Sequence, residues 1–459
     1  MTHKIVVGLD VIETGGSEII NSLGRNKDVE LFFDRKNVEK QGEQNNPLVR
    51  EFMDYGFQEG TRDENGFWVI DNGENRIKIK FQSPDSWSEC EAMTDDPSTR
   101  EFFYEKGVQS VEEPDFLKVN PSVLRKGFVS QKTDRPFESL EDIFEPKKEG
   151  INVDFPNQFI LLNCEDGRQA LYMSKKDFEI SGPDIDIQSD MYLQRIEPET
   201  SFFLGANKSA FEGKHLSFGI EANHLSQYLA WKYLLLDPKI QFVTLSGKAG
   251  SGKTLLGYLS GLEQTLIDSE GDINKNFRYK MMRLLKPAVP PNEHQVGYLP
   301  GDLEAKLGPQ MDSFKTLHDE DITPGFRYSD ALDVQQGNKY RKLGLFFPTN
   351  KVPLIKEDTI AFAKGSTWAK QMIIVDEAED MRRSHGRGLA TRVGFGSKMI
   401  FCGDPYQVEN PACSSDKNAL VYIAQKLAKE QHPSAAMMNL EKTNRSPIAN
   451  TVASFHKVD

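Results

Sequence analysis

The sequence predicts an α/β fold with a largely parallel sheet for residues 216–459. Two observations lead to this prediction. Short apolar runs alternate with helical stretches, and a glycine-rich segment typical of phosphate binding lies between one such run and the helical stretch that follows it. The run at 372–375 is continuously apolar, as expected for a strand with both faces covered. The runs expected to form strands are residues 242–245, 372–375 and 399–402.

The glycine-rich segment matches the phosphate-loop pattern G-x-x-x-x-G-K-[ST]. An apolar run at 240–245 precedes it and a helix-like run at 255–266 follows it. Glycines let backbone N–H groups point at phosphates, Lys253 adds a positive charge, and the Thr254 hydroxyl can ligate Mg²⁺ at a helix start that favours anions. The residues predicted to bind the nucleotide are Gly247, Lys248, Ala249, Gly250, Ser251, Gly252, Lys253 and Thr254.

Two carboxylates follow the apolar run at 373–375, in the form of a Walker B motif. Asp376 is predicted to hold the Mg²⁺ that bridges the β- and γ-phosphates, and Glu377 to position or polarise the attacking water. The phosphate loop upstream favours this interpretation over a strand that merely ends in surface acids. Lys253 and Mg²⁺ would then stabilise charge on the transferring phosphoryl group.

Three further polar residues extend the predicted site. Gln407, in the segment 403–407 after an apolar run, is placed to contact the γ-phosphate or the lytic water. Arg445 can stabilise charge on the phosphoryl group, in its own or a neighbouring subunit. Gln227 has the donor and the acceptor needed to read the adenine edge. A plain turn at 403–407 and a surface arginine at 445 stay open as alternatives.

Composition limits the remaining functions. A chain of 459 residues predicts two or three domains, and an apolar fraction of 38% is enough for packed cores. Four cysteines without a C-x-x-C pair predict a reducing compartment, here the cytoplasm, without a zinc site or a disulfide framework. No apolar run reaches the roughly 18 residues of a membrane helix, and a signal peptide is not expected. The net charge of −13 argues against non-specific adhesion to nucleic acid or membranes but leaves room for a local basic channel.

The first 215 residues differ in character and predict an α/β or α+β module in front of the larger domain. Acidic, proline-bearing sequence with little periodicity fills the middle of this region. The expected parts are a module at 1–83, an acidic linker or insertion at 84–155, and a connecting hairpin region at 156–215.

Local patterns predict individual elements within these parts. Residues 4–9 form an apolar run that predicts a strand. A hairpin is expected at 64–81, where Asn72-Gly73 is a turn signal between the runs 67–70 and 77–79. A second hairpin is expected at 159–173, around an acidic turn that contains Gly167.

Taken together, the motifs resemble the ATPase domain of PhoH-like proteins. The resemblance covers about residues 216–455, and the run Leu299-Pro300-Gly301-Asp302-Leu303 is its most specific part. It implies a RecA-like nucleotide-binding domain, related to superfamily-one helicase cores, that hydrolyses ATP. The segments that agree with the family are 218–227, 243–256, 297–306, 374–378, 391–398, 403–407 and 445–446.

The resemblance also implies roles for the predicted site residues. Gln227 would contact adenine, and the loop at 247–254 would bind the phosphates. Asp376 would hold the metal and Glu377 the water. Gln407 and Arg445 would be sensors of the γ-phosphate.

The chain departs from the family pattern in two places. Glu379-Asp380 stands where the family often has Gln-Asn, and an arginine-rich turn expected before that strand is Lys364-Gly365-Ser366 here. Both changes make the local surface less basic, which weakens the inference that this face binds RNA.

Some members of the family join the ATPase to an N-terminal PIN-type ribonuclease. The segments 6–10 and 29–39 resemble the opening of that domain. Such enzymes gather carboxylates around Mg²⁺ or Mn²⁺ to activate water on a phosphodiester, and Asp10 and Glu39 would be the first two ligands. Because Ile12 stands where a small polar residue is expected, the prediction is a degenerate PIN-like module, with solvated surface acids as the alternative.

The expected function is Mg²⁺-dependent ATP hydrolysis coupled to remodelling or unwinding of RNA, with ATP and single-stranded RNA as partners. Two alternatives stay open: an ATP-dependent switch that assembles or gates a protein partner, and a PIN-type ribonuclease fused to an ATPase. One RecA-like domain alone leaves its nucleotide pocket open, so a homo-oligomer, with a ring as one form, is also expected.

Overall fold

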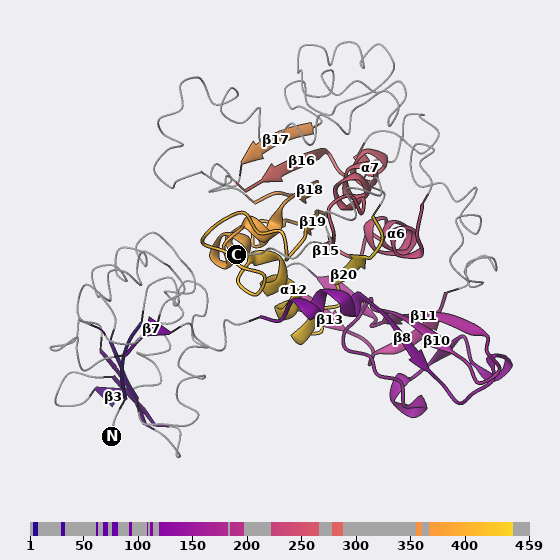
Figure 1. Cartoon of the computed structure of the whole chain (residues 1–459), viewed down its shortest axis with the longest axis horizontal. Coiled ribbons are helices and arrows are strands. Elements are labelled where there is room, and N and C mark those ends of the chain that lie inside the picture. Colours follow the sequence, from indigo (N-terminus) through magenta and orange to yellow (C-terminus); the bar gives the residue numbers. More distant parts are fainter. Residues whose placement is uncertain are drawn as a thin grey trace, which may run out of the picture. The chain divides into compact units, whose positions relative to one another are not determined.

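The structure is a computed structural model (Figure 1). The chain divides into two compact units, one formed by residues 1–119 with 382–387 and the other by the rest of the chain. The residues that the structure describes are 119–181, 184–196, 222–265, 278–287 and 367–443, together with residue 108 and the strands given below within 3–112 and at 355–359.

The first unit contains a seven-stranded sheet with the order β3-β4-β5-β2-β1-β6-β7. The central pairs β5–β2, β2–β1 and β1–β6 are parallel, and so is β6–β7. The pairs β3–β4 and β4–β5 are antiparallel. The strands are β1 (His3–Val7), β2 (Val29–Phe32), β3 (Thr61–Arg62), β4 (Trp68–Asp71), β5 (Arg76–Lys80), β6 (Glu91–Met93) and β7 (Val111–Glu112).

Two predictions for this unit are confirmed. The strand expected at 4–9 is β1, where Ile5 and Val7 are buried. The hairpin expected at 64–81 is the antiparallel pair β4–β5, in which Trp68 lies opposite Ile79. The candidate metal ligands of a PIN-like module, Asp10 and Glu39, lie outside the described residues.

The second unit contains a six-stranded, fully parallel sheet with the order β17-β16-β18-β19-β15-β20. The three strands predicted from apolar runs are confirmed as β15, β18 and β19. Every residue of β15 and β19 is buried, as expected for central strands with both faces covered. The strands are β15 (Phe242–Gly247), β16 (Met281–Lys286), β17 (Ile355–Thr359), β18 (Gln371–Val375), β19 (Lys398–Gly403) and β20 (Ala435–Leu440).

Helices complete the α/β fold of this sheet, which is that of a RecA-like domain. The helix predicted at 255–266 is confirmed as α7, and Asn418 begins α12 by accepting a hydrogen bond from the N–H of Val421 at 3.0 Å. Among the described residues, no helix has both the length and the apolar character needed to span a membrane. The helices are α6 (Leu225–Leu229), the π-helix η9 (Ala230–Leu235), α7 (Lys253–Thr265), the 3₁₀ turn η13 (Ala378–Asp380) and α12 (Ala419–Lys429). A further helix, α11 (Arg383–Ala390), begins in residues that are assigned to the first unit.

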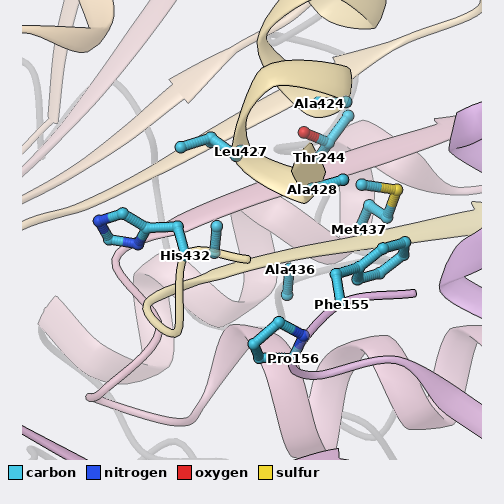
Figure 2. A pocket seen from close by; sticks show the side chains of 10 residues that line it. Phe155, Pro156, Thr244, Ala424, Leu427, Ala428, His432, Ala436 and Met437 are labelled. Carbon is cyan, nitrogen blue, oxygen red and sulfur yellow. The ribbon is translucent and has the colours of Figure 1, made fainter. Parts of the chain in front are cut away.

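The two faces of the parallel sheet are covered by different helices. Leu256 of α7 shares a core cluster with Val243 of β15. Thr244 points to the opposite face, because side chains alternate along a strand. There it lines a small cavity with Ala424 of α12 (Figure 2).

A second sheet, of five strands, lies within the same unit and has the order β8-β10-β11-β14-β9. The hairpin predicted at 159–173 is confirmed as the antiparallel pair β10–β11. The strands of this sheet are β8 (Phe128–Lys132), β9 (Ile143–Phe144), β10 (Phe159–Asn163), β11 (Gln169–Lys175) and β14 (Tyr192–Arg195). A separate hairpin consists of β12 (Phe178–Ser181) and β13 (Asp184–Ile187). The 3₁₀ helices of this region are η3 (Pro121–Gly127), η4 (Phe137–Ser139) and η5 (Pro146–Glu149).

The five-stranded sheet differs from the predicted division into a linker at 84–155 and a hairpin region at 156–215. Strands β8 and β9 come from the expected linker, yet β8 pairs with β10 and β9 pairs with β14. Residues 120–155 are therefore part of a packed sheet. Their strands are short and separated by 3₁₀ turns, so the apolar residues follow no simple period.

This sheet packs against β20, the edge strand of the parallel sheet. Phe159 and Met173 belong to the same core cluster as Val243 of β15. At the end of η3, Gly127 lies so close to the backbone of Met437 in β20 that a Cβ would overlap it. The contact covers one edge of the parallel sheet, which protects that edge from pairing with another chain.

Asn157 joins the two sheets through its side chain. Its Nδ2 donates hydrogen bonds to the carbonyl oxygens of Pro433 at 2.8 Å and Ala435 at 2.9 Å. The residue is buried, and its φ of 64° lies in the left-handed region, which asparagine tolerates better than most residues. Next to this contact, Phe155 and Pro156 line the cavity seen in Figure 2, whose volume of about 10 Å³ is close to the smallest that holds a water molecule.

We expect Asn157→Ala to lower the free energy of unfolding by about 2–4 kcal/mol, because two buried carbonyls lose their donor and alanine is strained at a positive φ. Asn157→Gly accepts the φ without strain, so it should show a smaller loss that reports the hydrogen bonds alone. Urea unfolding of the full chain measures both. The exposed Asn152 is the control: a loss in Asn157→Ala no larger than that of Asn152→Ala would contradict this role.

Candidate functional site

The phosphate loop leaves the carboxyl end of β15 and leads directly into α7. Three of its glycines have positive φ values: 146° at Gly247, 80° at Gly250 and 90° at Gly252. A Cβ at Gly247 would lie 2.5 Å from the carbonyl oxygen of Leu440, so a larger residue does not fit there. These backbone angles curve the chain into a concave turn at the start of a helix, where N–H groups favour an anion.

Lys253 is folded back into this turn. Its Nζ donates to the carbonyl oxygens of Gly247 at 2.7 Å and Lys248 at 3.2 Å, and the residue is 9% exposed. The nearby hydroxyl of Ser251 is buried and has no hydrogen-bond partner among the described residues. A buried ammonium held only by neutral carbonyls, next to an unpaired hydroxyl, suits a loop that binds phosphate oxygens.

Thr254 connects this loop to the end of β18. Its Oγ1 donates to Oδ1 of Asp376 at 2.7 Å, and Asp376 is 5% exposed. A hydroxyl and a carboxylate oxygen at this separation are hard ligands of the kind that Mg²⁺ takes from a protein that also binds a phosphate. The two residues predicted to hold the metal are thus side by side.

Lys286 is part of this site and was missed by the sequence reasoning. Its Nζ lies 3.6 Å from Oδ2 of Asp376 and 3.9 Å from Oε1 of Glu377. It ends β16, whose Leu285 accepts a hydrogen bond from the N–H of Asp376 at 2.9 Å. The signal in the sequence was a lysine directly after an apolar run, but only the pairing of β16 with β18 shows that it faces the two acids.

Glu377 has an unusual backbone conformation. Its φ of 53° and ψ of 44° place a non-glycine residue in the left-handed region, which costs about 1–2 kcal/mol. Burial and then the charge of Asp376 raise the pKa of its carboxyl, while Lys286 lowers it. Because 52% of the side chain is exposed, water limits the size of this rise. A strained residue beside a phosphate loop is the kind of feature that is found at functional sites.

The loop after β19 is tied to the loop after β18. The N–H of Asp404 donates to Oε1 of Glu379 at 2.9 Å, and Oδ1 of Asp380 accepts from the N–H groups of Glu409 at 2.6 Å and Asn410 at 2.8 Å. Gln407 lies between these anchors, with an exposed side chain. The parallel register therefore brings Gln407 to the same edge of the sheet as Asp376.

Gln227 lies against the phosphate loop. It sits in α6, its Nε2 donates to the carbonyl oxygen of Ser251 at 2.9 Å, and its Oε1 accepts from the N–H of Asn223 at 2.9 Å. One N–H of the amide and one lone pair of its oxygen are thus engaged within the protein, which leaves the second N–H and the second lone pair for a base. Arg445, the remaining predicted site residue, lies outside the described residues.

The helix that carries Gln227 is anchored by a buried lysine. Nζ of Lys398, at the start of β19, donates to the carbonyl oxygens of Leu234 at 2.7 Å, Leu235 at 2.7 Å and Asp237 at 2.8 Å. These carbonyls end η9, which continues α6, and they match the three N–H donors of an ammonium. Complete burial lowers the pKa of Lys398 to about 7, and the charge of Asp237 opposes this shift.

Comparison with known proteins points to the same region. The family model described as "PhoH-like protein" matches residues 220–457. The chain is 31% identical over 303 residues to "Protein PhoH2" of Bacillus subtilis (strain 168), covering 65% of this chain and 56% of that protein. It is 26% identical over 261 residues to "Protein PhoH2" of Thermobispora bispora, covering 57% and 51%. It is 30% identical over 165 residues to "PhoH-like protein" of Bacillus subtilis (strain 168), covering 36% and 43%. The chain spans about half the length of the relatives it matches.

We expect the stability difference between wild type and Lys398→Met to depend on pH. The folded-state pKa of about 7 lies below the ordinary 10.5, so between these values the unfolded chain binds more protons and wild-type stability rises with pH. The slope is at most about 1.4 kcal/mol per pH unit. Urea unfolding at pH 7, 8 and 9 measures it, with the exposed Lys429→Met as a control whose difference should stay flat. A flat difference for Lys398→Met would show that the carbonyls keep the ammonium at its ordinary pKa.

Proposed function

The chain belongs to the PhoH-like protein family, and we propose that it is an ATPase that couples Mg²⁺-dependent hydrolysis to remodelling or unwinding of RNA. Family membership supports nucleotide binding directly. The observation that carries the finer proposal is the 2.7 Å hydrogen bond between Thr254 and Asp376, which joins the phosphate loop to the acidic end of β18. In P-loop enzymes a hydroxyl and a carboxylate from these two places hold the metal.

In this proposal each residue has a defined task. The backbone of residues 247–254 and the ammonium of Lys253 bind the phosphates, and Lys253 exchanges its carbonyl partners for phosphate oxygens. Thr254 and Asp376 hold Mg²⁺, which when bound would neutralise charge on the β- and γ-phosphates. Glu377 orients the attacking water and accepts its proton.

Three further tasks complete the reaction. Gln407 contacts the γ-phosphate or the water from the loop after β19, and Arg445 adds positive charge to the transferring group. Gln227 contacts adenine through the N–H and the lone pair that Ser251 and Asn223 leave unused. Arg445 would act in its own subunit or on a neighbour, and a neighbour requires the homo-oligomer, with a ring as one form, that is part of this proposal.

The use of the energy has two candidate forms. The family's likeness to helicase cores supports action on RNA, whereas the net charge of −13 favours the alternative of a switch that assembles or gates a protein partner. A PIN-type cleavage of RNA that depends on Asp10 would be a separate activity of the first unit. Cys164 and Cys402 are buried free thiols, which supports the cytoplasm as the proposed location.

We expect Lys253→Ala to lower phosphate release from ATP about 100-fold or more, because the transferring group loses its charge partner. Glu377→Gln should lower it by a similar factor of about 100 or more while nucleotide binding is kept, because only the base is lost. Phosphate release and binding of a fluorescent ATP analogue, measured on both purified variants, separate these effects. Turnover equal to wild type in either variant would sink the assignment.

Single-stranded RNA should raise the ATPase rate if RNA is the substrate. The stimulation should fall steeply between about 50 and 200 mM salt, because phosphate contacts release counterions. Polyuridylate is the probe, and Lys253→Ala is the control that assigns the stimulated activity to this site. Hydrolysis that depends on Lys253 but is not stimulated at low salt would favour the protein-partner switch.

A further inference from the structure

Glu379 is a buried acid at the centre of the site and has no task in the reaction described above. It lies in η13, between the ends of β18 and β19, and is 1% exposed. Its Oε1 accepts a hydrogen bond from the N–H of Asp404 at 2.9 Å. Its Oε2 is buried and has no hydrogen-bond partner among the described residues. A carboxylate oxygen left in this state is costly unless it carries a proton.

Gly403 shows that the position of this carboxyl is built into the fold. A Cβ at Gly403, the last residue of β19, would overlap Oε2 of Glu379 and lie 3.0 Å from Leu420 of α12. The carboxyl therefore packs directly on the backbone of β19, with an apolar side chain behind it. This packing excludes water from Oε2 and limits where its proton can point.

The charge that acts on Glu379 is that of Glu377, at the end of β18. Burial, followed by this charge, raises the pKa of Glu379 well above its ordinary value, while the hydrogen bond from the N–H of Asp404 after β19 lowers it. The contact between the two carboxyls raises the pKa of Glu379 and lowers that of Glu377. Asp376 and Lys253 act on the pKa of Glu377 and on that of the buried thiol of Cys402.

We propose that Glu379 is a positioning residue that works as a neutral acid: Oε1 accepts from the N–H of Asp404, and the proton on Oε2 is donated to the carboxylate of Glu377. This assignment rests on the proposed ATPase function, because it gives the orientation of Glu377 its purpose. It also joins the two loops that carry Glu377 and Gln407, since the N–H of Gln407 donates to the carbonyl oxygen of Asp404 at 3.0 Å.

Loss of the Glu379 proton has a definite consequence. Two carboxylates would then face each other without a donor between them, and Glu377 would move away from Glu379 and from the water that it orients. Turnover should therefore decline on the alkaline side, in a range set by Glu379. Glutamine is the matched test, because its amide is neutral at every pH, accepts through Oε1 and donates through Nε2.

The first experiment compares the pH profiles of kcat for wild type, Glu379→Gln and Glu379→Ala. At pH 7, we expect the kcat of Glu379→Gln to be about tenfold or more higher than that of Glu379→Ala, because only the amide holds Glu377 in place. Wild type should lose activity as the pH rises on the alkaline side, and Glu379→Gln should lack this decline. Glu430→Gln, an exposed acid at the end of α12, should follow wild type. An unchanged alkaline decline in Glu379→Gln, or activity as low as that of Glu379→Ala, overturns the inference.

The second experiment needs no hydrolysis. A folded-state pKa above the ordinary 4.5 means that the folded chain holds the proton longer than the unfolded chain, so this stability is lost as pH rises through the folded pKa. The Tm of wild type should therefore fall relative to that of Glu379→Gln from pH 5 to pH 9. A Tm difference between the two proteins that stays constant with pH overturns the proposal that Glu379 is a neutral acid. If wild type releases no phosphate, or if Lys253→Ala releases as much phosphate as wild type, the proposed ATPase function is overturned instead. The Tm comparison then still decides whether Glu379 is a neutral acid.

Discussion

The constraint on which the site depends is the parallel register of the central sheet. Because β15, β16, β18 and β19 run in the same direction, their carboxyl ends meet at one edge. At this edge Asp376, which follows β18, accepts a hydrogen bond from the hydroxyl of Thr254 at the start of α7 and lies 3.6 Å from the ammonium of Lys286 at the end of β16. A change in register at any of these strands would separate partners that are distant in the sequence.

The five-stranded sheet also stabilises the position of the phosphate loop. It covers β20, the neighbour of β15, and it holds this strand through Asn157 and through the close approach of Gly127. Leu440 at the end of β20 in turn lies against Gly247, where the phosphate loop begins. The start of the loop is thus packed between a strand that the second sheet holds in place and the central strands. Residues 120–196 therefore contribute to the geometry of a site that they do not enter.

The sequence was sufficient for features that depend on local pattern, and insufficient for those that depend on pairing. Residues 247–254 and 376–377 were predicted correctly as loop and strand end, because glycine spacing and apolar runs are short-range signals. Lys286 was missed because its role appears only when β16 lies beside β18. The sheet at 120–155 was missed because its strands are short and irregular. Glu379 was noted only as a departure from the family pattern that makes the local surface less basic, whereas the structure buries it against Gly403.

The charges at this edge explain why one of its acids should be neutral. Lys286 faces both Asp376 and Glu377, while Lys253 is directed to the carbonyls of the phosphate loop. A further ionised carboxylate at Glu379 would be buried beside the carboxylate of Glu377, which is more costly than binding a proton. A triphosphate would add negative charge and draw Lys253 to its oxygens. The charge of Lys286 would then not be enough to neutralise Asp376, which would also need a metal ion. Keeping Glu379 protonated lets the site hold Glu377 in place without adding to the repulsion that an incoming nucleotide must overcome.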